Sequence, residues 1–384
     1  MTPFGTHCYF DHNATTAVAR ECIDAMNACW RLGAVNPSSK HSQGERAKQL
    51  VIEARHLVSH FLGASPSEIV FTGSGTEANH CAILGALELQ PERRHVITSA
   101  VEHPSTLMLL RHLETRGLRV TYLPVDAEGR LKLEALEDTL TPATALVSLM
   151  WANNETGVIF PIAEAAALAR AHGVLFHTDA VQAVGKLPID LQATPVDFLS
   201  LSGHKLYAPA GIGALFIRKG IRVSPMLFGH QERGRRGGTE NLSGIVALGV
   251  ACATLRAQAD RDAPNVRALR DRLETGVLRR IPYARVNGGA APRVCNTSSL
   301  RFGDRDAETI LGRLDRLGFY ASAGAACSSA GTRPSHVLTA MGLKPSAALA
   351  SIRFSLGRHN NEQEVDALLR VLPGVLSDLA VLTA

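Results

Sequence analysis

The stretch DFLSLSGHKLYAPAGIGALFI, residues 197–217, holds one lysine between two apolar runs. The runs 196–202 and 211–220 are short, continuous and apolar, as in strands that are buried on both faces. Lysine is among the residues least often buried, and burial without a partner lowers the pKa of its amine. Lys205 is therefore either a turn lysine whose ammonium group reaches water along its apolar stem, or an amine kept neutral for use as a nucleophile.

Helical and strand-like segments alternate around this stretch from about residue 47. Strands are expected at EIVFTG (68–73), HVITSAV (95–101), RVTYLPV (119–125), TALVSLMWA (144–152) and GVLFHTDA (173–180), with amphipathic helices between them. This order predicts an α/β fold with a mostly parallel sheet covered on both faces, in which 211–220 is a final, antiparallel strand. In such sheets, ligands bind beyond the carboxyl ends of the strands.

A different order of elements follows a long helix expected at 242–260. A helix at 265–281, a strand at 297–302, a helix at 306–318, a strand at 351–357 and a last helix from about 361 predict a smaller α+β domain. At 384 residues the chain exceeds the usual size of a single core. We expect a large domain over 16–255 and a small domain formed by 1–15 and 256–384.

The composition argues against several classes of protein. The net charge of +5 comes without a long basic run, so nucleic acid is not an expected partner. No stretch approaches the roughly 20 apolar residues of a membrane span, and the first residues lack the pattern of a signal peptide, so we expect a cytoplasmic protein. The seven cysteines are scattered without a C-x-x-C pair, so neither a disulfide framework nor a metal site is expected.

Polar residues follow the ends of successive predicted strands. In FTGSGTEANH (71–80) a strand passes into a helix, so the amides of Gly75 and Thr76 and the Thr76 hydroxyl suit a phosphate group, or Thr76 is simply a helix N-cap. His103, before another helix, is either a cap or a residue that stacks on a cofactor ring and moves protons. Asp179 ends an apolar strand, where its carboxylate is either a helix cap or the partner of a protonated pyridine nitrogen.

These features occur in one order along the chain: a phosphate cradle, a histidine above a ring, an aspartate for a pyridinium and a lysine for a Schiff base. Pyridoxal 5′-phosphate (PLP) is the cofactor that uses all four. The order therefore favours the nucleophilic role for Lys205 over the turn lysine.

The chain resembles the PLP-dependent cysteine desulfurases of the nitrogen-fixation and iron–sulfur-cluster class, which belong to the class-V aminotransferase family. The resemblance runs nearly end to end, through YFDHNATT, NPSSKHSQG, TGSGTEAN, VEHPS, WANNETGVIFPI, HTDAVQAVGK, SLSGHKLYAP, GHQERGRRGGTEN, SAGAACSSAGTRPSHVL and IRFSLGR. It implies a fold type I PLP-dependent transferase with a seven-stranded sheet flanked by helices. It also implies conversion of L-cysteine to L-alanine.

The resemblance also implies roles for single residues. Lys205 would carry PLP, Asp179 would pair with the pyridine nitrogen, and Gln182 would contact the ring hydroxyl. His103 would stack on the ring and act as acid or base. The phosphate would be held by Gly75, Thr76, Ser202, His204 and, from the partner subunit of a homodimer, Thr239; Asn154 would contact both cofactor and substrate, and Arg353 would bind the substrate carboxylate.

Cys327 lies in a run of small residues, within a loop expected at about 320–336, where an exposed and reactive thiol is more natural than a core position. The resemblance implies that Cys327 accepts the substrate sulfur as a persulfide and passes it to an acceptor or iron–sulfur scaffold protein. Relatives often carry Ser-Gly-Ser-Ala-Cys here, where this chain has SAGAACSS. Cys295 precedes a strand-like run and is expected to be dispensable.

Three other functions remain open from the sequence: a selenocysteine lyase, another PLP-dependent β-lyase, and a non-catalytic subunit for sulfur relay or assembly. A non-catalytic subunit would have no need of Lys205, Asp179, His103 and Cys327 together. The cysteine desulfurase is therefore the preferred interpretation.

Overall fold

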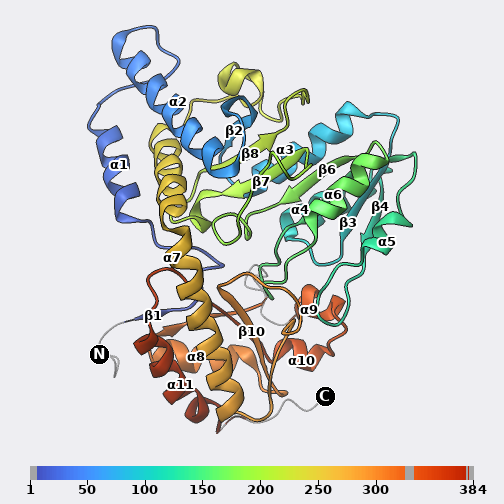
Figure 1. Ribbon diagram of the computed structural model, residues 1–384, viewed down its shortest axis with the longest axis vertical. Helices are drawn as coiled ribbons and strands as arrows, with labels where there is room; N and C mark the ends of the chain where they lie inside the picture. The colour runs from blue at the N-terminus through green and yellow to red at the C-terminus, as the bar shows by residue number, and fades with distance from the viewer. Residues whose placement is uncertain (1–6, 325–332, 378, 380–384) are drawn as a thin grey trace.

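The computed structural model describes residues 7–324, 333–377 and 379. A larger body built on a wide sheet lies above a smaller one in Figure 1, and helix α7 (Leu242–Arg280) runs through both. The remaining helices are α1 (Arg20–Trp30), α2 (Ser42–Leu62), α3 (Gly75–Leu89), α4 (Pro104–Glu114), α5 (Leu133–Glu137), α6 (Ile162–Ala171), α8 (Ala307–Arg316), α9 (His336–Ala340), α10 (Pro345–Leu349) and α11 (Glu362–Ser377).

The larger body contains a seven-stranded sheet in the order β2-β8-β7-β6-β5-β3-β4. The strands are β2 (Ile69–Thr72), β3 (His95–Ser99), β4 (Arg119–Leu123), β5 (Thr144–Met150), β6 (Leu175–Asp179), β7 (Phe198–Ser202) and β8 (Gly213–Ile217). Strands β7, β6, β5, β3 and β4 run parallel, while β8 is antiparallel to both of its neighbours. The predicted α/β class and the antiparallel last strand are therefore confirmed.

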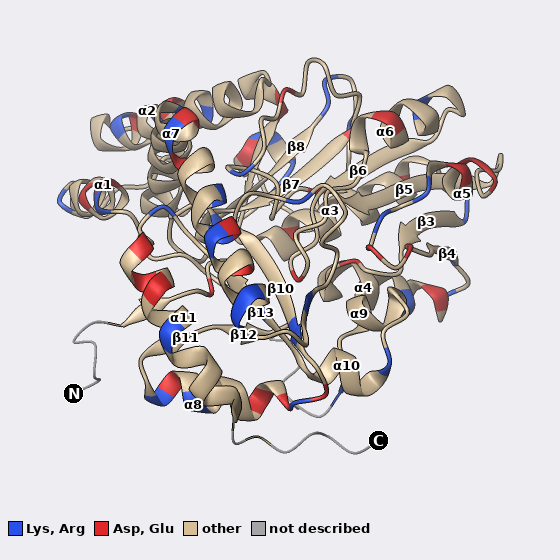
Figure 2. Cartoon of the chain, turned by 60° about the horizontal axis from the view of Figure 1, so that its bottom comes forward, with Lys and Arg blue, Asp and Glu red and all other residues tan. Residues whose placement is uncertain are grey.

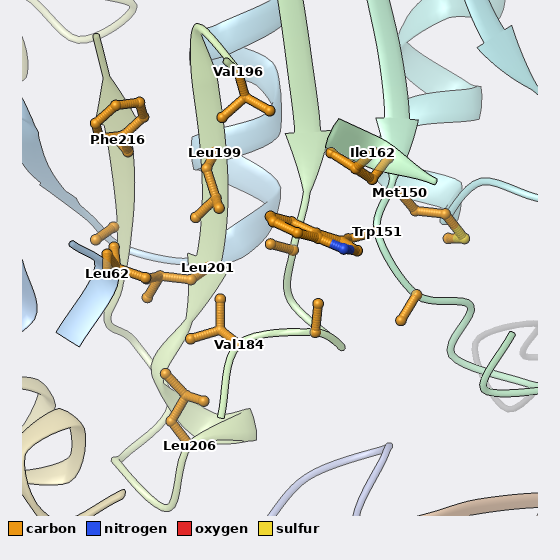
Figure 3. Close-up of a cluster of buried hydrophobic side chains, with 14 of the residues drawn as sticks. Leu62, Met150, Trp151, Ile162, Val184, Val196, Leu199, Leu201, Leu206 and Phe216 are labelled. Carbon is orange, nitrogen blue, oxygen red and sulfur yellow. The ribbon is translucent and has the colours of Figure 1, made fainter. Parts of the chain in front are cut away.

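Side chains on neighbouring positions of these strands enter two different hydrophobic clusters. Leu199 and Leu201 of β7 and Phe216 of β8 join the cluster that also takes Leu62, at the end of α2 (Figure 3). Phe198 points the other way, into a cluster with residues of α3 and α4. Because successive residues of a strand face opposite sides, this division shows that both faces of the sheet are covered.

The smaller body contains a four-stranded antiparallel sheet in the order β12-β13-β10-β9. Its strands are β9 (Ala284–Val286), β10 (Thr297–Phe302), β12 (Ser322–Ala323) and β13 (Ser351–Ser355), and the short β1 (Cys8–Tyr9) pairs with β11 (Phe319–Tyr320). A separate core of Phe10, Phe302, Phe354 and their neighbours lies beneath α8 and α11. The N-terminal segment therefore packs with the C-terminal part of the chain.

Helix α7 is continuous where the sequence predicts two helices. It passes through Pro264, which lacks the N–H for one intrahelical hydrogen bond. Leu255 packs into the core of the larger body and Val266 into that of the smaller one, so burial on both sides of the proline stabilises the single helix. Figure 2 shows charges of both signs along α7 and α11, which are joined by an ion pair of 2.7 Å between Arg272 and Asp366.

Part of α7 has a mean hydropathy of 1.4 over an 18-residue window, so by length and composition alone the helix could cross a membrane. The sequence analysis expected no such segment. The apolar residues in the first half of α7 pack against α1 and α2 and into the core of the larger body. This packing accounts for the apolar composition of the helix.

Candidate active site

The predicted residues of the larger body gather at the carboxyl edge of its sheet. Asp179 is the last residue of β6 and Ser202 the last of β7. A single 3₁₀ turn, Gly203–Lys205, follows β7 and presents His204 and Lys205 at the same edge. Parallel strands bring their carboxyl ends together, so main-chain geometry alone collects these groups.

The start of α3 lies close to the ends of β6 and β7. A Cβ atom on Gly75 would lie 2.8 Å from Val181 Cγ2 and 3.2 Å from the Cβ of Ser202, so only glycine permits this approach. Ser74, rather than Thr76, is the N-cap of the helix, since its side chain accepts a hydrogen bond from the Glu77 N–H. The alternative of Thr76 as a simple N-cap is therefore wrong, and the exposed Thr76 stands beside a helix N-terminus that suits an anion.

Asp179 is held by neutral donors. The side chain is 6% exposed, and its Oδ2 accepts from Asn79 Nδ2 at 2.7 Å while its Oδ1 accepts from the Val181 N–H at 3.0 Å. Asn79 also donates to Ser105 Oγ at 3.0 Å. Asn79 belongs to the TGSGTEAN stretch, but no role was predicted for it from the sequence. Its position as a polar residue on the buried face of α3 is the pattern that could have identified it.

His103 is both a helix cap and a site residue. Its Nδ1 accepts from the Ser105 N–H at 3.1 Å and lies 2.8 Å from Ser105 Oγ, at the N-cap of α4. Burial lowers the pKa of His103, the nearby Asp179 raises it, and the charges of Lys205 and His336 lower it further. The imidazole is therefore neutral near pH 7, with Nδ1 occupied as an acceptor and Nε2 left to carry the proton.

Lys205 is half-buried, not fully buried as its position between two strands suggested. Its Nζ donates to the backbone carbonyl of Asn13 and, at 2.6 Å, to that of Ala14. Two residues later, Tyr207 adopts a left-handed φ of 63°, which is costly for a side chain of that size. The N–H of Tyr207 donates to Thr16 Oγ1 at 2.9 Å, so the N-terminal segment holds the strained turn that carries Lys205.

Asn13 connects the two bodies, and the sequence analysis missed it. Its backbone carbonyl accepts from Lys205 and from Gln182 Nε2, the latter at 3.0 Å. Its side-chain Nδ2 donates to the Asn154 carbonyl at 3.0 Å and to Thr297 Oγ1 at 2.8 Å. One buried asparagine therefore contacts three residues that the sequence assigned to the site.

Arg353 and Asn154 lie together, as expected. Arg353 is 3% exposed on β13, and its Nη1 donates to the Asn154 carbonyl at 3.2 Å. Its Nη2 is also paired with Asp11 Oδ1 at 2.6 Å, an interaction that the sequence analysis did not foresee. Its Nε is buried and has no hydrogen-bond partner among the residues that the structure describes.

Glu155, which follows the apolar run 144–152 and was given no role from the sequence, joins two parts of the smaller body to the larger one. Its Oε2 accepts from Ser335 Oγ at 2.5 Å. A Cβ atom on Gly324 would lie 2.3 Å from the same oxygen. Burial raises the pKa of Glu155, while the Ser335 hydrogen bond and the charges of His336 and Arg353 oppose that rise.

Cys327 lies outside the described residues, between Gly324 and Ser335 in sequence. Thr239 is exposed in the loop that follows the 3₁₀ turn Gln231–Gly234.

Known proteins resemble the chain over nearly its whole length. The family model Aminotransferase class-V matches residues 8–368. The cysteine desulfurase of Gluconacetobacter diazotrophicus is 49% identical over 374 residues, which cover 97% of this chain and 94% of that protein. The cysteine desulfurase NifS of Azotobacter vinelandii is 48% identical, with 97% of this chain and 93% of that protein covered.

Solved structures show the same similarity. A NifS-like protein has a TM-score of 0.91 at 35% sequence identity, and the match covers 97% of this chain and 100% of that chain. SspA in complex with cysteine has a TM-score of 0.82 at 34% identity, and the match covers 92% of this chain and 100% of that chain. The resemblance expected from the sequence motifs is thus confirmed, and the chain belongs to the class-V aminotransferase family, among its cysteine desulfurases.

Proposed function

We propose that this protein uses PLP held on Lys205 to transfer the sulfur of L-cysteine to Cys327, leaving L-alanine. The observation that carries the proposal is the meeting of four groups at one sheet edge: the Lys205 amine, the Asp179 carboxylate, the neutral His103 imidazole and the N-terminus of α3. The structure of the related SspA in complex with cysteine supports L-cysteine as the substrate.

The residues present fit PLP. Gly75 permits the close approach of α3 to Ser202, which forms an anion site with Thr76 and His204 for the phosphate. Asp179, whose two oxygens are fixed by Asn79 and the Val181 N–H, would hold the protonated ring nitrogen. When bound, PLP supplies an electron sink that stabilises negative charge at the substrate α-carbon.

The protein's own groups would handle substrate and protons. Arg353 and Asn154, which contact each other, would hold the substrate carboxylate, whose geometry a planar guanidinium matches. The amine of Lys205 would remove the α-proton, and His103 would donate a proton from Nε2. The Cys327 thiolate would then attack the substrate sulfur, so that an S–S bond forms on Cys327 as the C–S bond of cysteine breaks and the carbon product leaves as alanine.

We also propose that the protein works as a homodimer and passes its sulfur to another protein. Thr239 of a second copy would complete the phosphate site in a homodimer. An acceptor or iron–sulfur scaffold protein would take the terminal sulfur in the cytoplasm.

Peptide mapping tests the two covalent assignments. Borohydride reduction of the holoenzyme should fix the pyridoxyl group on Lys205, and a pyridoxyl group on another lysine would refute that assignment. After incubation with L-cysteine and alkylation, mass spectrometry should find the extra sulfur on Cys327 in wild type and in the Cys295→Ala control. Sulfide release with no sulfur on any protein cysteine would make the protein a β-lyase.

A further inference from the structure

Lys186 lies in the turn after β6, four residues beyond Gln182, and the proposed function gives it no role. Its Nζ donates to Gln182 Oε1 at 2.5 Å and to Asn13 Oδ1 at 3.0 Å. Both acceptors are side-chain amide oxygens, not carboxylates. The side chain is half-buried, and an ammonium group held there without a carboxylate partner is costly to keep, which indicates that its charge or its donors are used.

The hydrogen bonds of Lys186 fix the orientation of two amides. An ammonium group only donates, so the atoms that face it must be the oxygens of Gln182 and Asn13. The NH₂ group of Gln182 is thereby directed to the Asn13 carbonyl at 3.0 Å, the same oxygen that accepts from Lys205. The NH₂ group of Asn13 is directed to Asn154 and Thr297.

Charged and titratable groups from four other parts of the chain surround Lys186. Burial lowers the pKa of Lys186 to about 7; the charges of Lys205 and Arg353 also lower it, and Cys295 opposes them. The charge of Lys186 in turn lowers the pKa of His12. Because the repulsion between two cations is mutual, a charged Lys186 favours the neutral form of the Lys205 amine.

We propose that Lys186 is a positioning residue of the active site, which orients the amides of Gln182 and Asn13 and places a positive charge beside Lys205. The inference rests on the proposed function, in which Lys205 holds PLP and Gln182 meets its ring hydroxyl. A Gln182 amide with its oxygen held by Lys186 can offer only donors to that hydroxyl, so it selects the ionised form.

A cavity beside this cluster permits a matched set of substitutions. It has a volume of about 50 Å³ and is lined by Lys186, Lys205 and Cys295, so side chains of about the length of lysine can be placed at position 186. Lys186→Met removes both donors and charge, Lys186→Gln keeps a donor without the charge, and Lys186→Arg keeps both. Lys132→Met, at an exposed lysine before α5, is the control.

Cofactor affinity and the pH titration of the visible absorbance are measured on each variant. Lys186→Met should weaken PLP binding about tenfold, as for the loss of a charge-assisted hydrogen bond. It should also raise the midpoint pH of the absorbance titration by about half a unit or more, because a nearby positive charge no longer opposes protonation of the Lys205 nitrogen. Lys186→Arg should restore both values, and Lys132→Met should change neither.

The outcomes separate this inference from the proposed function. A wild-type protein that binds no PLP on Lys205 contradicts the proposed function itself. Normal binding in wild type, with the same affinity and midpoint in Lys186→Met, contradicts only the role of Lys186, even where the melting temperature falls. Should Lys186→Met not fold, equal midpoints for the Arg and Gln variants contradict the role of the charge.

Discussion

The two sides of the active site are built in different ways. On the larger body, Asp179, Ser202 and Lys205 stand where main-chain strands end, so the sheet itself fixes them. On the smaller body, Arg353 is fixed by side-chain bonds to Asp11 and to the Asn154 carbonyl. In the proposed function, the sheet edge would hold the cofactor through main-chain geometry, whereas the junction between the bodies would bind the substrate through side chains.

The largest effect is expected at the sheet edge. Asp179→Ala should lower turnover on the order of a hundredfold, equal to about 3 kcal/mol of transition-state stabilisation, because a preorganised charge at the ring nitrogen is lost. Steady-state alanine production measures this effect, with the exposed Asp24→Ala as control. Near-normal turnover would mean that Asp179 has no part in the mechanism. The sheet edge would then matter no more for turnover than the junction does.

A smaller effect, of a different kind, is expected across the junction. Arg353→Ala should raise the KM for L-cysteine about tenfold or more, as for the loss of a hydrogen bond between charged groups, while the absorbance of bound PLP stays unchanged. Arg272→Ala, which removes only exposed ion pairs with Glu362 and Asp366, serves as the control. An unchanged KM would mean that Arg353 is only a structural ion-pair partner of Asp11. Residues of the larger body would then bind the substrate without it.

Glu155 tests whether the junction affects the chemistry after binding. Its carboxylate accepts a hydrogen bond from Ser335 and lies close to Gly324, and these two residues stand on either side of Cys327 in the sequence. Ser335→Ala should lower alanine formation several-fold and destabilise folding by about 1–3 kcal/mol, because a buried acceptor loses its donor. PLP affinity should not change, and a parallel loss of PLP would contradict the separation of the two sides.

The sequence predicted the sheet edge better than the junction for a physical reason. Apolar runs and the turns that follow them are local patterns, and parallel pairing then collects their ends without further information. Asn13 and Thr297 are 284 residues apart, and Arg353 and Asp11 are 342 apart, so no local pattern announces these bonds. The roles expected of the junction residues Asn154 and Arg353 came from the family resemblance, Glu155 was given no role, and Asn13 and Asp11 were missed. The same limit applies to α7, where Pro264 predicts a break that packing on both bodies prevents.

The smallest effect concerns Glu102, a buried residue of the larger body behind His103. Its Oε1 accepts from Ser99 Oγ at 2.6 Å and from the Met150 N–H at 3.0 Å, while its Oε2 has no hydrogen-bond partner within the described part of the chain. Burial raises the pKa of Glu102 to about 8; Asp179 adds to the rise, and the bonds from Ser99 and Met150 oppose it. The folded protein therefore keeps a proton that the unfolded chain releases above about pH 4.5, and stability falls as pH rises from there through about 8.

Glu102→Gln removes this pH dependence, since the amide has the shape and the single acceptor of the protonated carboxyl group. Denaturant unfolding between pH 6 and pH 8 should show wild type losing up to about 2 kcal/mol more than the variant. The exposed Glu164→Gln should follow wild type. Parallel curves for wild type and Glu102→Gln would mean that Glu102 is ionised in the folded protein. Two negative charges, those of Glu102 and Asp179, would then repel each other at the sheet edge, and a second carboxylate would compete with Asp179 for the positive charge of the ring nitrogen.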